Sequence, residues 1–288
     1  MTKNQKGVQA LVALAALSTV CMQTAHAENK LFPTDVLNRG QFDIVADQGV
    51  SELKLDTQAR FFPETTTDTL HGSGSSVAAR VGVGAQTHVG ASLNYAVARS
   101  HVQYAYPGLD IPDSHAKAKG FQGWSLWVKH GFLTSASSPL SLAAGLQVDL
   151  ETDRNLGAEA HNTASASVTA GWDFGSGVKG FAELTQHMAE HGKYDQRTEI
   201  TAGTWVPVGR SVTLAPSVNF TRAASQGDVP SFNQYGLALQ GLLQVTNDTY
   251  VRSTLSVSRA EGFDTTDGWV HVGTATGKSL SIGLYHLF

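Results

Sequence analysis

The feature that most constrains this chain is a period-two alternation of apolar and polar residues, which recurs from about residue 41 to residue 288. Successive side chains of a β-strand point to opposite faces, so the alternation predicts strands with one apolar face. The clearest examples are VAARVGVG (77–84), HVGASLNYAV (88–97), LSLAAGLQVDL (140–150), TASASVTAGWDF (163–174), VTLAPSVNF (212–220) and YGLALQGLLQV (235–245). We therefore expect an all-β fold.

A soluble sandwich and a membrane barrel both alternate in this way. Two features favour the barrel. The polar face consists mainly of Ser, Thr, Gly, Gln and Asn, whereas a water-facing surface would carry more Lys and Glu. The alternating segments also run to about 10 residues or more, the length used by outer-membrane strands, whereas globular strands average about 5–6.

Turn residues divide the alternation into about twelve strands joined by connections that are short and long in turn. This alternation of lengths is typical of outer-membrane barrels, with short periplasmic turns and longer extracellular loops. The prediction is a closed antiparallel up-and-down transmembrane β-barrel over residues 41–288, whose longest loops are 101–120 and 260–277. Pro216 lies within a predicted strand and cannot donate a ladder hydrogen bond, so we expect a local bulge there. The predicted strands are 41–50, 74–84, 88–100, 121–133, 140–151, 162–174, 178–189, 196–206, 212–223, 233–245, 249–259 and 278–288.

The N-terminal stretch has the pattern of a secretory signal peptide at 1–27: Lys3 and Lys6, an apolar run, and the small-residue site Ala25-His26-Ala27. The apolar run is shorter than the ~20 residues of a membrane-spanning helix, which disfavours a retained anchor. Cys21 is the only cysteine, so the exported chain would have no disulfide and no thiolate site. Residues 28–40 either stay in the periplasm or fold into the barrel as a plug-like segment.

Charge argues against one class of partner. Without Lys3 and Lys6, 18 Lys and Arg stand against 24 Asp and Glu, which gives the exported chain a net charge of −6. A nucleic-acid partner would require a basic face, so we expect none.

The last ten residues, SLSIGLYHLF, place Leu280, Ile282, Leu284 and Phe288 on one face. This segment resembles the C-terminal signal of Gram-negative outer-membrane β-barrel proteins. The resemblance implies that these four residues are read by the barrel assembly machinery. It also implies that the chain resides in the bacterial outer membrane, in contact with outer-membrane lipid and lipopolysaccharide.

A narrower resemblance rests on the length, the entry LNRGQFDIV and the ending GLYHLF. These are similar to the outer-membrane transporters named after phenol meta-pathway operons. That resemblance implies passive passage of a small solute in the hydrophobic or aromatic range.

Charged residues on the polar face of the strands are the candidate pore lining. An Arg or Lys that faced lipid at the midplane would cost ~2–4 kcal/mol, so these residues should point inward. They could form a paired network that fills a narrow barrel, or the polar lining of an open pore, and a twelve-stranded bore alone does not decide between the two. The candidates are Arg80, Lys129, Asp149, Asp173, Glu183, His187, Glu199 and Arg252.

Enzymatic function is the main rival, because some outer-membrane barrels act on lipids with a Ser/His pair. The His-x-Ser-Asn stretch of the phospholipase type is absent from the sequence. His187 and His191 are four residues apart, which on a strand is ~13 Å and too far for one metal ion. We therefore expect a channel or transporter with no catalytic residue, cofactor or metal. The alternatives are a lipid-acting barrel enzyme and a structural or adhesion barrel that works through its loops.

Overall fold

The computed structural model describes residues 32–60, 64–133, 138–151, 162–189, 196–225 and 227–288. The expected signal peptide at 1–27 lies outside these residues, as does the first part of the 28–40 segment. No helix within the described ranges is long and apolar enough to cross a membrane. The regular elements in these ranges are β-strands. In chain order they are β1 (Phe42–Ala59), β2 (Thr65–Gly82), β3 (Thr87–Ala105), β4 (Ser114–Leu133), β5 (Leu140–Glu151), β6 (Thr163–Gly175), β7 (Val178–Ala189), β8 (Arg197–Val208), β9 (Val212–Ala223), β10 (Phe232–Gln244), β11 (Thr249–Ala260), β12 (Phe263–Asp264), β13 (Val270–Val272) and β14 (Ala275–Leu287).

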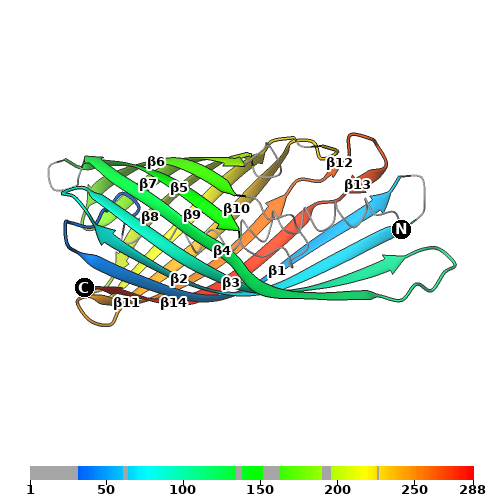
Figure 1. The fold of residues 1–288 in the computed structure, drawn as a ribbon, viewed down its shortest axis with the longest axis horizontal. Helices are drawn as coiled ribbons and strands as arrows, with labels where there is room; N and C mark the ends of the chain where they lie inside the picture. The colour runs from blue at the N-terminus through cyan, green and yellow to red at the C-terminus, as the bar shows by residue number, and fades with distance from the viewer. Residues whose placement is uncertain (1–31, 61–63, 134–137, 152–161, 190–195, 226) are drawn as a thin grey trace.

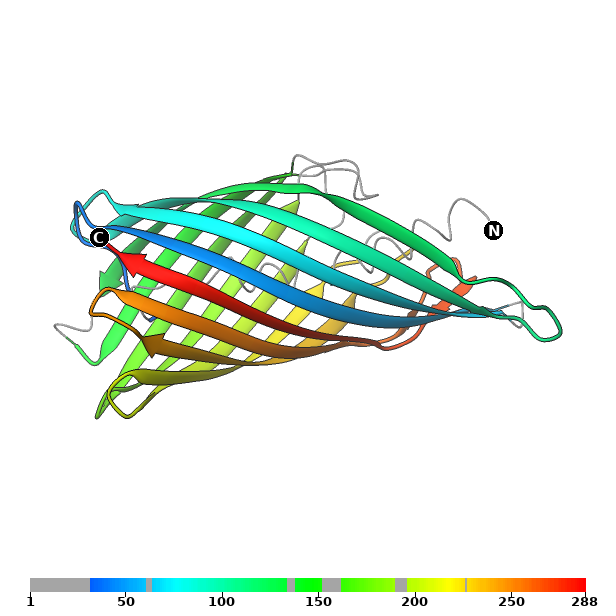
Figure 2. The same ribbon diagram turned by 90° about the horizontal axis from the view of Figure 1, so that it is seen from below.

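The strands form one closed antiparallel ring. Each strand from β1 to β10 pairs with the next one in the chain, and β14 closes the ring by pairing with both β11 and β1. The two short strands β12 and β13 prolong the β11–β14 hairpin, because β13 pairs with β1 just beyond the part of β1 that pairs with β14. The wall is therefore that of a twelve-stranded barrel, and the predicted fold class is confirmed (Figures 1 and 2).

The two ends of the barrel differ. One end, which we call the turn end, carries Phe288 and the short connections 83–86, 176–177, 209–211 and 245–248. It lies on the left in Figure 1, beside the C-terminus. The opposite end, the loop end, carries the connections 106–113 and 261–274.

The first four strands are longer than predicted. They contain 18, 18, 19 and 20 residues, whereas β5–β11 contain 12 or 13. Most of 51–73 and 101–120, which the predicted strands left as connections, is paired strand. A strand needs only about 10 residues to cross the bilayer, so the additional pairs reach beyond it, where both faces can be polar and the hydrophobic alternation disappears. Figure 2 shows these strands extending past the rest of the wall toward the loop end.

Pro216 does not produce the expected bulge. It pairs with Leu239 on β10 without a change of register. On the β8 side, the pairs Gly203–Ser217 and Val206–Leu214 keep one register, and the two pairs between them are missing. Proline has no N–H, so the ladder loses bonds locally and gains no extra residue.

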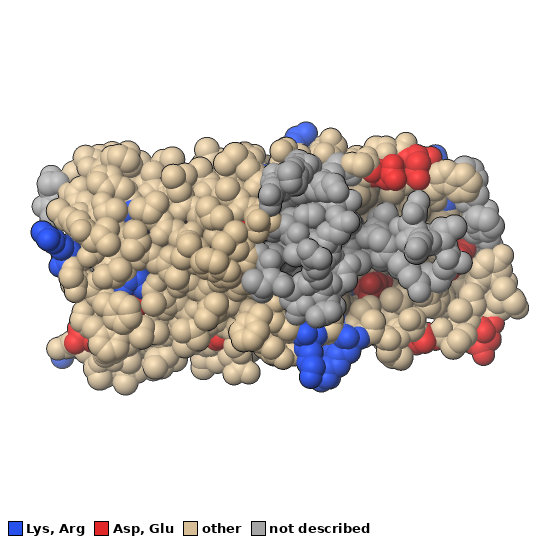
Figure 3. Space-filling model, viewed as in Figure 1, with Lys and Arg blue, Asp and Glu red and all other residues tan. Residues whose placement is uncertain are grey.

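The wall is apolar outside and mostly polar inside. Large aliphatic side chains on the outer face are about half exposed, with Leu237 at 58% and Ile282 at 61%, whereas the inward Thr169 is 0% exposed. In Figure 3 the half of the surface toward the turn end is almost uncharged. Such a face is suited to lipid, and ring closure leaves no strand edge unpaired in hydrocarbon.

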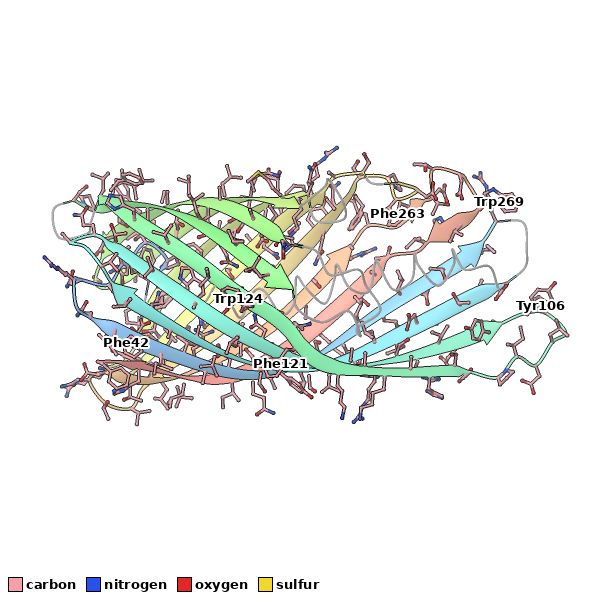
Figure 4. The ribbon with its side chains drawn as sticks, viewed as in Figure 1. Phe42, Tyr106, Phe121, Trp124, Phe263 and Trp269 are labelled. Atoms are coloured by element: carbon pink, nitrogen blue, oxygen red, sulfur yellow. The ribbon has the colours of Figure 1, made fainter. Side chains whose placement is uncertain are left out.

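Aromatic rings mark the borders of this apolar face. Near the turn end the rings of Phe42 and Phe288 lie 5.4 Å apart. Toward the middle of the barrel, Tyr95 and Phe121 form a T-shaped pair with centroids 5.6 Å apart. Figure 4 shows Phe42 near the turn end and Phe121 and Trp124 near mid-length. Rings at both borders are typical of the interfaces of a transmembrane barrel.

Candidate functional site

Two of the eight predicted residues, Arg80 and Arg252, each lie in the lumen beside an aspartate of β1. Arg80 donates from Nε to Asp43 Oδ1 at 2.9 Å and from a terminal nitrogen to Oδ2 at 2.5 Å. The Nε of Arg252 lies 3.1 Å from Asp47 Oδ1. All four side chains are at most 5% exposed. One buried ion pair joins β1 to β2 and the other joins β1 to β11. Removal of one partner from either pair would strongly destabilise the barrel, because the remaining charge would stay buried.

Lys129 and Glu183 lie on the inward faces of β4 and β7. The ammonium of Lys129 donates to the backbone carbonyl of Pro33, and Glu183 is the carboxylate whose charge acts on it. Glu183 accepts a hydrogen bond from Thr169 Oγ1 at 2.7 Å. Lys129 therefore links the barrel wall to the chain that precedes β1.

His187, Glu199 and Asp149 also face inward. The Nε2 of His187 lies 3.9 Å from Glu199 Oε2, across the β7–β8 pair. Asp149 accepts hydrogen bonds from Gln147 Nε2 at 2.7 Å and from Thr163 Oγ1 at 3.2 Å. These residues form a polar strip on β5–β8.

Asp173 differs from the other seven residues because it lies at the turn end of β6. Its Oδ1 accepts the backbone N–H of Gly175 at 2.8 Å, which stabilises the β6–β7 turn. All eight predicted residues thus lie on the inward side of the strands, and each has at least one polar partner.

Residues Phe32–Leu37, which we call the lumenal segment, lie inside the barrel near the turn end. Phe32 packs edge-on against Phe181 and Trp205, with ring centroids 6.1 and 5.9 Å away. Farther along, the Leu37 N–H donates to His88 Nδ1 at 3.3 Å. Because Trp205 belongs to β8 and His88 to β3, the lumenal segment spans the bore.

The segment is also held at its centre and at its exit. Thr34 Oγ1 and Ser141 Oγ are 2.6 Å apart. A Cβ at Gly82 would lie 1.9 Å from the backbone oxygen of Asn38, so only glycine permits this approach.

Gly171 on β6 makes room for the start of the lumenal segment. A Cβ at this position would lie 2.5 Å from both Phe32 Cε1 and Ser141 Oγ. A larger residue at this inward position would therefore compete directly with Phe32 for space. The neighbouring strand carries another inward glycine, Gly145, whose Cβ would meet Ser167 Oγ at 3.1 Å and Val128 O at 3.5 Å.

Small side chains line the lumen between the lumenal segment and the loop end. Gly49 and Ser51 on β1 and Gly74 and Ser76 on β2, with Ser279 and Ser281 on β14, border one recess. Side chains of this size leave space beside the wall and turn hydroxyl groups toward the lumen.

An apolar cluster lies inside the wall at the loop end. Leu53, Leu55 and Leu70 pack against Val272 and Ala275, and Phe263 packs beside them. The connection from β11 to β14, which contains β12 and β13 and which we call the return, therefore faces the lumen with apolar side chains.

The sequence reasoning missed Asp43 and Asp47, the partners of the two arginines. Both share the inward parity of β1, so the alternation that selected Arg80 could also have selected them. It missed the contacts of the lumenal segment for a different reason, since residues 32–40 have no alternation to interpret. Within the described ranges, no group of three or more His, Cys, Asp and Glu residues is arranged to hold a metal ion.

The fold is similar to that of solved outer-membrane barrels. An outer membrane channel from Pseudomonas putida F1 gives a TM-score of 0.60 at 11% identity, covering 91% of this chain and 100% of that one. The translocator domain of the autotransporter NalP from Neisseria meningitidis gives 0.52 at 10% identity, covering 98% and 97%. The CymD monoaromatic hydrocarbon channel gives 0.45 at 10% identity, covering 89% and 90%. No protein-family model matches the chain, and no curated protein matches its sequence. At these identities the likeness is one of fold: the chain has the β-barrel fold of bacterial outer-membrane proteins.

Proposed function

We propose that this protein is an outer-membrane channel for the passive passage of a small solute, and that the lumenal segment restricts the pore. The turn end would face the periplasm, as short turns do in outer-membrane barrels. The observation that carries the proposal is the contrast between a wall closed by continuous ladders and a bore crossed by one short segment.

The lumenal segment is held far more weakly than the wall. Its described attachments are a few hydrogen bonds and the burial of Phe32 and Leu37, each apolar side chain contributing about 1.5–3 kcal/mol. Opening the wall would break a whole strand ladder, for example the twelve β1–β14 pairs. Displacement of the segment is thus the low-cost route to an open pore.

The lining supports a small solute with apolar or aromatic character. Leu55 and Phe263 are among the apolar residues inside the loop end, and Phe32, Phe181 and Trp205 lie near the turn end. The inward arginines of β2 and β11, Arg80 and Arg252, are each neutralised by an aspartate of β1. A lining with paired charges and apolar patches favours an uncharged molecule over an ion.

Conductance in a planar bilayer tests the channel. We expect low conductance from the wild-type barrel and a larger, steady conductance from Gly171→Val, because the added side chain displaces Phe32. Gly145→Ala is the matched control: it adds bulk to the lumen of the neighbouring strand without contacting the lumenal segment. A folded barrel with no conductance in either variant, and no solute uptake in liposomes, would contradict the proposal.

Liposome uptake tests the class of solute. We expect a small neutral aromatic compound to enter faster than a charged compound of the same size. Equal uptake rates for the two compounds would be consistent with a channel but would contradict the preference for a neutral aromatic solute. Lipid turnover by the purified barrel, or loop-dependent surface binding without uptake, would instead favour the enzyme or the adhesion barrel.

A further inference from the structure

Three cations gather on the outer face of β3 and β4. Arg99 lies directly opposite Lys117 in the β3–β4 pair, and Lys119 follows two residues later on the same face of β4. All three side chains are exposed. We call Arg99, Lys117 and Lys119 the cation patch.

The cation patch has no counter-charge on its own strands. β3 and β4 contain no Asp or Glu. The neighbouring outward residue on β2 is His71, opposite Arg99. Glu52 on β1 lies 3.7 Å from His71, but its other oxygen is 3.0 Å from Lys278. On the loop-end side, the carboxylate of Asp113 is bound to His101 Nε2 at 2.8 Å. Like charges placed directly opposite each other destabilise a strand pair, so an anion bound between Arg99 and Lys117 would stabilise this part of the wall.

The position of the patch relative to the apolar face indicates which anion. Lys119 is two residues from Phe121, which packs edge-on against Tyr95 at the border of the apolar face. Below this pair, Leu93 and Leu126 are 57% and 44% exposed on the outer side. Figure 3 shows a group of Lys and Arg atoms at the lower edge of the molecule, beside the uncharged half. The cations thus lie one step beyond the hydrocarbon border, on the loop-end side.

We propose that the cation patch binds the phosphate groups of lipid A in lipopolysaccharide, whose acyl chains would lie on the apolar face below. Arginine and lysine make short, charge-assisted hydrogen bonds to phosphate, and an arginine can bind it through two nitrogens. The proposal rests on the orientation of the barrel, with the loop end outside, and does not depend on conductance.

The test uses the full barrel, folded in detergent free of lipopolysaccharide, and the variant Arg99→Gln/Lys117→Gln/Lys119→Gln. Arg39→Gln/Arg210→Gln is the control, since both of those arginines are exposed at the turn end. The measurements are the temperature at which the folded gel band is lost and the number of lipid A molecules bound in native mass spectrometry. The probes are lipid A with both phosphates, lipid A without phosphates, and inorganic phosphate.

We expect phosphorylated lipid A to bind and stabilise the wild type and the control, with about fivefold weaker binding for each patch cation removed. Without lipid, the triple variant should be at least as stable as the wild type, because a like-charge contact is gone. The triple variant should thus be less stable than the wild type with phosphorylated lipid A, and at least as stable without it. A folding defect would lower its stability under both conditions. Equal binding by the triple variant and the wild type would overturn the proposal. So would equal stabilisation by phosphate-free lipid A, or by inorganic phosphate alone.

Discussion

Arg80 on β2 holds Asp43 on β1 through two hydrogen bonds of 2.9 and 2.5 Å, and the two side chains are 2% and 0% exposed. Asp43→Asn would leave the guanidinium buried without its carboxylate, so we expect a loss of about 3–5 kcal/mol in the free energy of unfolding. Urea unfolding of the detergent-solubilised barrel, followed by tryptophan fluorescence, measures it. Asp43→Asn/Arg80→Gln should recover part of the loss, and an unchanged midpoint for the single variant would show that the pair contributes little.

Gly283 allows the second ion pair to form across a strand. Asp47, Gly283 and Arg252 lie in one row on β1, β14 and β11, and a Cβ at Gly283 would lie 1.9 Å from Asp47 Oδ1. We expect Gly283→Ala to lower stability by about 1–3 kcal/mol, the usual cost of overpacking. The control is Gly241→Ala on β10, whose nearest neighbour would be Ser253 Oγ at 3.1 Å. Equal midpoints for the two variants in the same unfolding experiment would argue against this role for Gly283.

The strand order and the inward parity of the charges were predictable from sequence because the membrane imposes them. Lipid requires every second residue to be apolar, so Leu146 and Leu237 identify their strands without any tertiary information. The extra length of β1–β4 was not predictable in this way. Beyond the bilayer, residues such as Thr67 and His101 meet water, and pairing continues without an apolar signal.

The arrangement of the lumen was only half predictable. Parity shows that Arg252 points inward, but its partner depends on which residues lie beside it in register. Asp47 lies two strands from Arg252, on the far side of Gly283. No pattern along the sequence predicts that these two residues are neighbours. The same applies to Phe32, whose contacts are with β7 and β8, distant in sequence.

Leu55 anchors the return through β12 and β13 to the wall at the loop end. It is 2% exposed and packs in the cluster that contains Val272. We expect Leu55→Ala to cost about 2–5 kcal/mol in local stability and to increase chymotrypsin cleavage at Phe263. Leu255→Ala is the control, because Leu255 is 54% exposed on the outer face and contributes nothing to this cluster. Equal cleavage rates in the two variants would mean that the return is held by its backbone pairs alone.

A substitution at Phe288 can distinguish closure of the barrel from its assembly in cells. The Phe288 N–H donates to the Phe42 carbonyl at 2.7 Å, and the Phe288 ring contacts those of Phe42 and His286. Phe288→Ala retains the backbone bond, so we expect the purified, refolded barrel to keep its heat-resistant gel mobility. In cells we expect several-fold less folded protein in the outer membrane, if the assembly machinery reads the terminal ring together with Leu280, Ile282 and Leu284. Phe174→Ala is a matched control, since Phe174 and Phe288 are both 64% exposed. An equal fall in yield for both variants would mean that lost contact with lipid, and not recognition of the last residue, limits assembly.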